Sequence, residues 1–184
     1  MFGFFKRARA LERKAEAYVA GLLREPSADD VAWLAKTATK GDEDHARWEL
    51  RYACRSIGQI VAQRDALDDR TASIVAQALT AAFESDKNID RDRFSLVEQQ
   101  FNARLSAYRD AIGARGTDTS TRLGQTLLAF SGGSFRDVDD NVRRAADIVA
   151  GFERDANEAL RSVFGSAALP EHMPPSAVVG APSK

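Results

Sequence analysis

The sequence predicts an all-α protein: an up-and-down bundle of six to seven helices, followed by a disordered Pro-rich C-terminal tail. Three observations lead to this fold class. Apolar residues return every three or four positions in each segment, which is the spacing of one helix face. No segment shows the alternation of apolar and polar residues that a half-buried strand requires. Gly, Pro and short acidic residues interrupt the pattern, so we expect short turns between the helices.

The stretch 44–83 is central to this prediction, because it is expected to form two consecutive helices that break only at Arg64 and Asp65. Each helix has an apolar stripe with helical spacing. The stripe residues are Leu50, Cys54, Ile57 and Val61 in the first helix and Leu67, Thr71, Ile74, Ala78 and Ala82 in the second. We expect the two helices to pack together as a hairpin or to form a kinked rod.

A row of arginines follows the opposite face of the first central helix. Arg47, Arg51 and Arg55 recur once per turn, and polar side chains on such a face stay in water while the apolar stripe packs. The sequence therefore predicts an exposed basic ridge. Acidic neighbours and the absence of a helix-turn-helix pattern favour a solvated face over a nucleic-acid contact, so no nucleic-acid partner is expected.

The N-terminal segment 1–24 is predicted to be the first helix of the bundle. The residues that we single out as a contact with a partner or a membrane are Phe2, Phe4, Phe5, Lys6, Arg7 and Arg9. Aromatic and basic residues together are typical of a helix that lies on an anionic membrane surface. Ala8 and Ala15 make the apolar stripe thin for lipid insertion. Docking on the bundle is therefore the favoured interpretation, and peripheral membrane contact is the less favoured one.

Cap and turn residues define the remaining helices. Ser27 is expected to cap a short helix that ends at Gly41, and Asp90 to cap the helix with the clearest apolar spacing. Residues 117–120 offer several caps for a shorter helix, and a last long helix is expected over about 135–164.

The chain is predicted to divide into two parts. Residues 1–164 form the helical bundle domain. Residues 165–184 form a flexible tail, because their Pro, Ser, Ala and Gly leave no apolar stripe to bury.

Composition and charge narrow the class of protein. The chain has 184 residues, 44% of them hydrophobic, which suffices for one domain with a core. The formal net charge of -1 indicates neither nucleic acid nor an anionic membrane as a partner. The 1 Cys, Cys54, can form no intramolecular disulfide, and its position on an apolar stripe predicts a buried side chain rather than a nucleophile. No apolar run approaches the ~20 residues of a spanning helix, and the N-terminus lacks a secretory signal, so a cytoplasmic location is expected.

A carboxylate-bridged metal pair is the best-known site in a helical bundle, and this sequence lacks its pattern. Such a site needs a Glu followed three residues later by His, twice, with further inward Glu residues. The sequence has 2 His and one comparable spacing, from Asp42 to His45. Glu49 lies one turn beyond His45, and Glu98 and Glu153 border apolar stripes on other helices. We therefore predict no metal site and no cofactor.

Two clusters of acidic residues are better explained by helix capping than by metal binding. They are Asp65, Asp68 and Asp69, and Asp137, Asp139 and Asp140. Both lie where helices are expected to begin, so N-terminal capping accounts for them better than magnesium binding does.

No Gly-flanked Ser lies near His45, so no Ser triad is expected. The sequence predicts no catalytic activity.

The remaining functions are binding functions. We favour a non-enzymatic interaction protein that self-associates or docks on a protein partner, with a homo-oligomer as the expected state. The alternative is a binder of an apolar small molecule in the bundle core, or, less favoured, a metal-dependent helical enzyme. The aromatic residues that would line such a small-molecule pocket are Phe94, Phe101, Tyr108, Phe130 and Phe152.

Overall fold

The computed structural model describes residues 2–65, 69–87, 89–115, 118–133 and 138–165, with the backbone alone for residues 2–7. These residues form seven α-helices and one 3-10 helix and contain no strand, which confirms the all-α fold class. The predicted tail lies, apart from Gly165, outside the described residues. The helices are α1 (Phe2–Leu22), α2 (Ala28–Thr37), α3 (Glu43–Asp65), α4 (Asp69–Ser85), the 3-10 helix η1 (Arg91–Arg93), α5 (Phe94–Gly113), α6 (Thr119–Phe130) and α7 (Asp140–Phe164).

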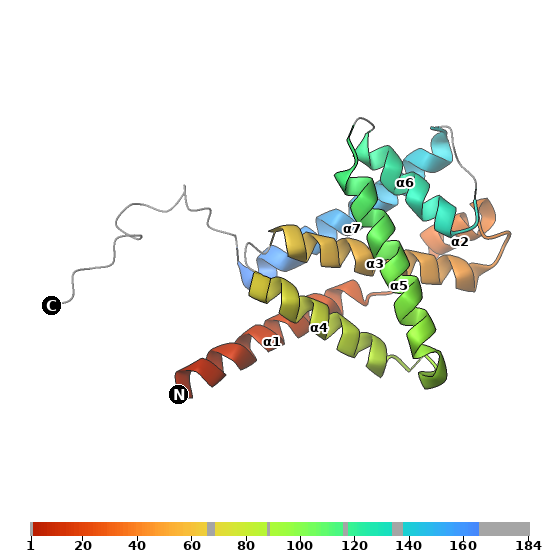
Figure 1. Cartoon of the computed structure of the whole chain (residues 1–184). Helices are drawn as coiled ribbons and strands as arrows, with labels where there is room; N and C mark the ends of the chain where they lie inside the picture. The colour runs from red at the N-terminus through yellow and green to blue at the C-terminus, as the bar shows by residue number, and fades with distance from the viewer. Residues whose placement is uncertain (1, 66–68, 88, 116–117, 134–137, 166–184) are drawn as a thin grey trace.

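Helix α3 runs through the middle of the bundle (Figure 1), and the other helices pack around it. Helix α5 crosses it on one side, and α7 lies along another. Helices α3 and α4 contact each other with the chain reversed between them, as the hairpin interpretation expects. No helix in the described part of the chain combines the length and the apolar character needed to cross a bilayer.

Helix α1 packs mainly against α4 and α7 rather than against α2, its neighbour in sequence. Ala15, Tyr18 and Leu22 of the predicted stripe are buried in these contacts. The hydroxyl of Tyr18 donates a hydrogen bond of 2.8 Å to the backbone carbonyl of Gly58 in α3. Over its described side chains, α1 is therefore a bundle helix, as the sequence indicates, and its N-terminal end lies at the edge of the molecule (Figure 1).

Short polar side chains start several helices as predicted, but Asp90 caps the 3-10 helix η1 rather than α5, and α2 ends at Thr37 rather than at Gly41. Ser27 Oγ accepts a hydrogen bond of 3.1 Å from the backbone amide of Asp30, and Asp118 caps α6 in the same way. Asp139 accepts from the amide of Val142 at 2.9 Å, so α7 begins at Asp140 and not near residue 135 as predicted. The reason is that a side chain bonded to these amides fixes the helix start locally.

The packing of α6 against α7 depends on a glycine. A methyl group added at Gly124 would lie 2.4 Å from the carbonyl oxygen of Val142 and 2.8 Å from the amide nitrogen of Ala146. Both atoms belong to the backbone of α7, so the two helix backbones touch at this point. A side chain of any size at position 124 would separate them.

Candidate functional site

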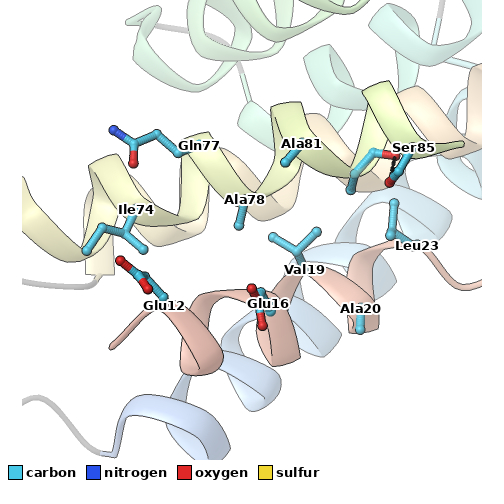
Figure 2. A pocket seen from close by; sticks show the side chains of 11 residues that line it. Glu12, Glu16, Val19, Ala20, Leu23, Ile74, Gln77, Ala78, Ala81 and Ser85 are labelled. Carbon is cyan, nitrogen blue, oxygen red and sulfur yellow. Dashed lines mark hydrogen bonds between the residues drawn. The ribbon is translucent and has the colours of Figure 1, made fainter. Parts of the chain in front are cut away.

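An open groove lies between α1 and α4 (Figure 2). We call it the α1–α4 groove; its volume is about 450 Å³. Figure 2 shows Val19 of α1 and Ala78 of α4 pointing toward each other, with the carboxylates of Glu12 and Glu16 along one edge. The groove residues are Glu12, Glu16, Val19, Ala20, Leu23, Ile74, Gln77, Ala78, Ala81, Ala82 and Ser85.

The same two carboxylates belong to a second surface feature, which we call the charged stripe of α1. Arg9, Glu12, Arg13 and Glu16 are all exposed and together line a hollow of about 590 Å³. Their spacing of three, one and three residues places them on one face of the helix. The signs along this face are plus, minus, plus and minus. The charged stripe therefore contains positive and negative side chains in equal number, so each charge has an opposite charge within the same stripe.

Of the predicted contact residues at the N-terminus, Arg9 is exposed and belongs to this stripe. The side chains of Phe2, Phe4, Phe5, Lys6 and Arg7 lie outside the described part of the chain.

A third feature is a pocket between α3 and the start of α5, which we call the α3–α5 pocket; its volume is about 430 Å³. Its apolar walls come from Trp48, Tyr52, Leu96 and Val97, and Arg93 stands among its polar lining residues. Leu96 is 50% exposed, which makes it one of the few large apolar side chains that the bundle leaves in water. The other lining residues are His45, Glu49, Ile89, Asp90, Gln100 and Arg104.

A largely buried ion pair lies at the base of this pocket, and both of its residues line the pocket. Arg104 donates to Glu49 in a two-point contact, in which its Nε lies 2.9 Å from Oε2 and its Nη2 bonds Oε1. Glu49 is 4% exposed, and the guanidinium of Arg104 lies over the rings of Tyr52 and Phe130, at 5.0 and 4.6 Å from their centres. His45 Nε2 lies 3.4 Å from Oε1 of Glu49. Both charges are thus held in fixed positions.

The sequence analysis did not anticipate this pair. Glu49 and Arg104 are separated by 55 residues. One feature of the sequence could have predicted the pair. Each of the two charged residues lies next to the apolar stripe of its own helix, and their charges are opposite.

The predicted basic ridge is wrong. Arg55 is 3% exposed, and its guanidinium lies 4.8 Å from the ring of Phe83 and 3.9 Å from a carboxylate oxygen of Asp86. The physical reason is that α3 is central, so α4 covers the face that the sequence pattern assigns to water. Burial lowers the pKa of Arg55, which the charge of Asp86 partly offsets. Two of its nitrogens, Nε and Nη1, have no hydrogen-bond partner in the described structure.

The other two arginines of the row are partly exposed but are paired. Arg51 binds the carboxylate of Glu25 at 2.6 Å, and Arg47 binds that of Asp44 at 2.6 Å. The three arginines therefore form no continuous basic surface.

Cys54 is half-buried, and its thiol lies 3.7 Å from the backbone carbonyl of Leu22. Burial raises the pKa of this thiol to about 11, so the thiol is overwhelmingly protonated at neutral pH. Since the thiolate is the nucleophilic form, this geometry agrees with the predicted packing role.

The three glutamates considered for a metal pair do not converge on one site. Glu49 binds Arg104, Glu153 lies 3.0 Å from Arg64, and Glu98 is exposed. Among the described residues, no three His, Cys, Asp or Glu side chains come close enough to share an ion.

The acidic clusters are only partly described, since Asp68 and Asp137 lie outside the described ranges. Asp139 caps α7, as expected. Asp65 does not start a helix: it is the last residue of α3, and its carboxylate binds the guanidinium of Arg64.

Most of the aromatic residues proposed for a core pocket lie in the hydrophobic core or pack against it. Phe101 and Tyr108 belong to the buried core, and Phe94 and Phe152 pack against it. Phe83 and Phe101 contact each other with ring centres 5.0 Å apart. Phe130 covers Arg104.

Comparison of the chain with protein-family models, with curated proteins and with solved structures finds no match.

Proposed function

We propose that this protein is a non-enzymatic interaction module that associates with a second copy of itself, in the cytoplasm. The observation that carries the proposal is the α1–α4 groove, which is apolar along its floor and open to solvent, with Glu12 and Glu16 at its edge. An apolar hollow with a polar border is typical of a protein contact surface. The half-buried single thiol of Cys54, which has no partner for a disulfide, fits a reducing compartment.

A second copy is the occupant that the charges favour. The groove has an acidic edge, and the N-terminal part of α1 is basic through Lys6, Arg7 and Arg9. Most homo-oligomers are closed by a twofold axis, across which the same surface serves both partners. A surface that carries an acidic groove and a basic helix segment satisfies this requirement.

Filling the groove should prevent self-association. In the Ala81→Arg variant a long cationic side chain would occupy the groove floor and repel a basic partner, so we expect the dimer dissociation constant to rise at least about tenfold, which is 1.4 kcal/mol. Ala81 is exposed, so the fold should tolerate the change. Sedimentation velocity over a range of protein concentrations measures the effect.

The matched control is Thr80→Arg, which adds the same side chain one residue away, at an exposed position that does not line the groove. It should dimerise as the unmodified protein does. An unmodified protein that stays monomeric at all concentrations, or an equal effect of the two variants, would refute the proposal.

A second candidate function is the binding of a small organic acid in the α3–α5 pocket. The pocket combines apolar walls with polar and charged side chains, and a ligand site needs both to hold an apolar body and to fix its orientation. Both oxygens of Glu49 are already bonded by Arg104, so the carboxylate at the base of the pocket is neutralised. Arg93 remains available for an anionic group, and Trp48 and Leu96 for an apolar body.

This candidate is tested by calorimetric titration with 4-phenylbutyrate and with its neutral amide. We expect the acid to bind at least about tenfold more tightly than the amide, and Arg93→Ala to remove the difference. Arg91→Ala is the control, because Arg91 lies in the same 3-10 turn and does not line the pocket. Equal binding of acid and amide, or no binding at millimolar concentration, would exclude this function.

A further inference from the structure

Helix α1 has a face that can pair with itself. Residues Arg9, Glu12 and Glu16 recur at steps of three and four, and the same spacing continues through Ala20 to Leu23 at one end and through positions 5 and 2 at the other. Residues at steps of three and four lie along one face of a helix. Phe2 and Phe5 occupy the last two positions in the sequence.

We infer that α1 pairs antiparallel with α1 of a second copy, across a twofold axis near residues 12 and 13. This inference rests on the proposed self-association and specifies its geometry. In this register Arg9 faces the partner's Glu16 and Glu12 faces the partner's Arg13. The twofold axis repeats both contacts, so every charge of the stripe meets its opposite.

The alternative orientation is disfavoured by the same charges. A parallel twofold pair places each residue beside its own copy, so that every arginine and every glutamate of the stripe meets a like charge. A parallel pair shifted along the helix is not closed by a twofold axis and would add further copies without limit.

The antiparallel register also accounts for the apolar residues. It brings position 2 of one copy opposite Leu23 of the other and position 5 opposite Ala20. Leu23 and Ala20 line the α1–α4 groove, so the register sets positions 2 and 5 of each copy, both Phe in the sequence, beside the apolar end of the partner's groove. Exposed ion pairs add little affinity by themselves. In this arrangement the apolar residues of the α1–α4 groove supply the affinity, and the charged stripe supplies the orientation.

Charge reversal on the stripe tests the pairing. The double variants Arg9→Glu/Arg13→Glu and Glu12→Arg/Glu16→Arg make the stripe wholly acidic or wholly basic. We expect each variant alone to self-associate at least about tenfold more weakly than the unmodified protein, and an equal mixture to form a heterodimer of about the original affinity. The control is Arg154→Glu/Arg161→Glu, which changes the net charge equally at exposed positions on α7.

A cross-linking experiment fixes the orientation. In a Cys54→Ala background, Glu12→Cys lies beside the axis, and a short bismaleimide should join two copies through it. Ala20→Cys lies far from its own copy in the antiparallel pair and should give no cross-link, whereas a parallel pair would join both.

The two proposals fail in different ways. If the unmodified protein dimerises but charge reversal has no effect, or if Ala20→Cys cross-links, the antiparallel register is wrong and self-association stands. If the unmodified protein is monomeric throughout, both are wrong.

Discussion

Replacing Arg104 with methionine is expected to lower the free energy of unfolding by about 3–5 kcal/mol. Methionine keeps most of the packing volume but leaves the carboxylate of Glu49 without the two hydrogen bonds that Arg104 supplies. Glu49 is 4% exposed, so only the small part of its carboxylate that faces the α3–α5 pocket could be solvated in place of these bonds. Denaturant titration followed by circular dichroism measures the loss.

The double variant Glu49→Leu/Arg104→Met provides the informative comparison. Removing both charges removes the desolvation cost together with the attraction, so its stability should return to within about 1 kcal/mol of the unmodified protein or exceed it. Arg143→Met, which breaks an exposed pair with Asp140, should change little. If the single Arg104 variant is as stable as the exposed control, the pair does not hold the buried position described here.

Replacing Gly124 with alanine is expected to lower the free energy of unfolding by about 1–3 kcal/mol. The added methyl group would lie within 3 Å of two backbone atoms of α7, at Val142 and Ala146, and backbone cannot move aside as a side chain can. Thermal melting of the variant measures the effect.

The matched substitution is Gly151→Ala, also inside a helix. The nearest atom to the added methyl there is the end of the Arg154 side chain, at 3.8 Å. Alanine should therefore raise the free energy of unfolding by about 0.5–1 kcal/mol, through its better helix propensity. Opposite signs at the two positions are the expected result, and a loss of the same size at both would mean that helix contact at Gly124 is not the cause.

The helices could be predicted from the sequence because their causes are local. Apolar spacing and caps such as Ser27 and Asp139 act within a few residues. The same local rule explains the error at the start of α7, where the spacing of apolar residues extends past the cap. Spacing shows which face is buried, whereas the cap decides where the helix begins.

The environment of α3 could not be predicted in this way. A single apolar stripe implies one buried face, but α3 is covered on several sides, and Arg55 is buried with Phe83 against it. Which helices meet around a central one is a property of the whole fold. The Glu49–Arg104 pair and the α1–α4 groove depend on the same long-range packing, so neither is visible from a single segment.

The packing of α1 against α4 and α7 has a consequence for how the chain is made. Helix α1 finds its main docking surfaces only when α4 and α7, which follow it in the chain, have been synthesised. Until then, Tyr18 and Leu22, which are buried in the finished protein, remain in water. Contacts between residues far apart in the sequence also slow folding. Before α4 and α7 are made, α1 therefore exposes apolar side chains of the kind that make folding intermediates prone to aggregate.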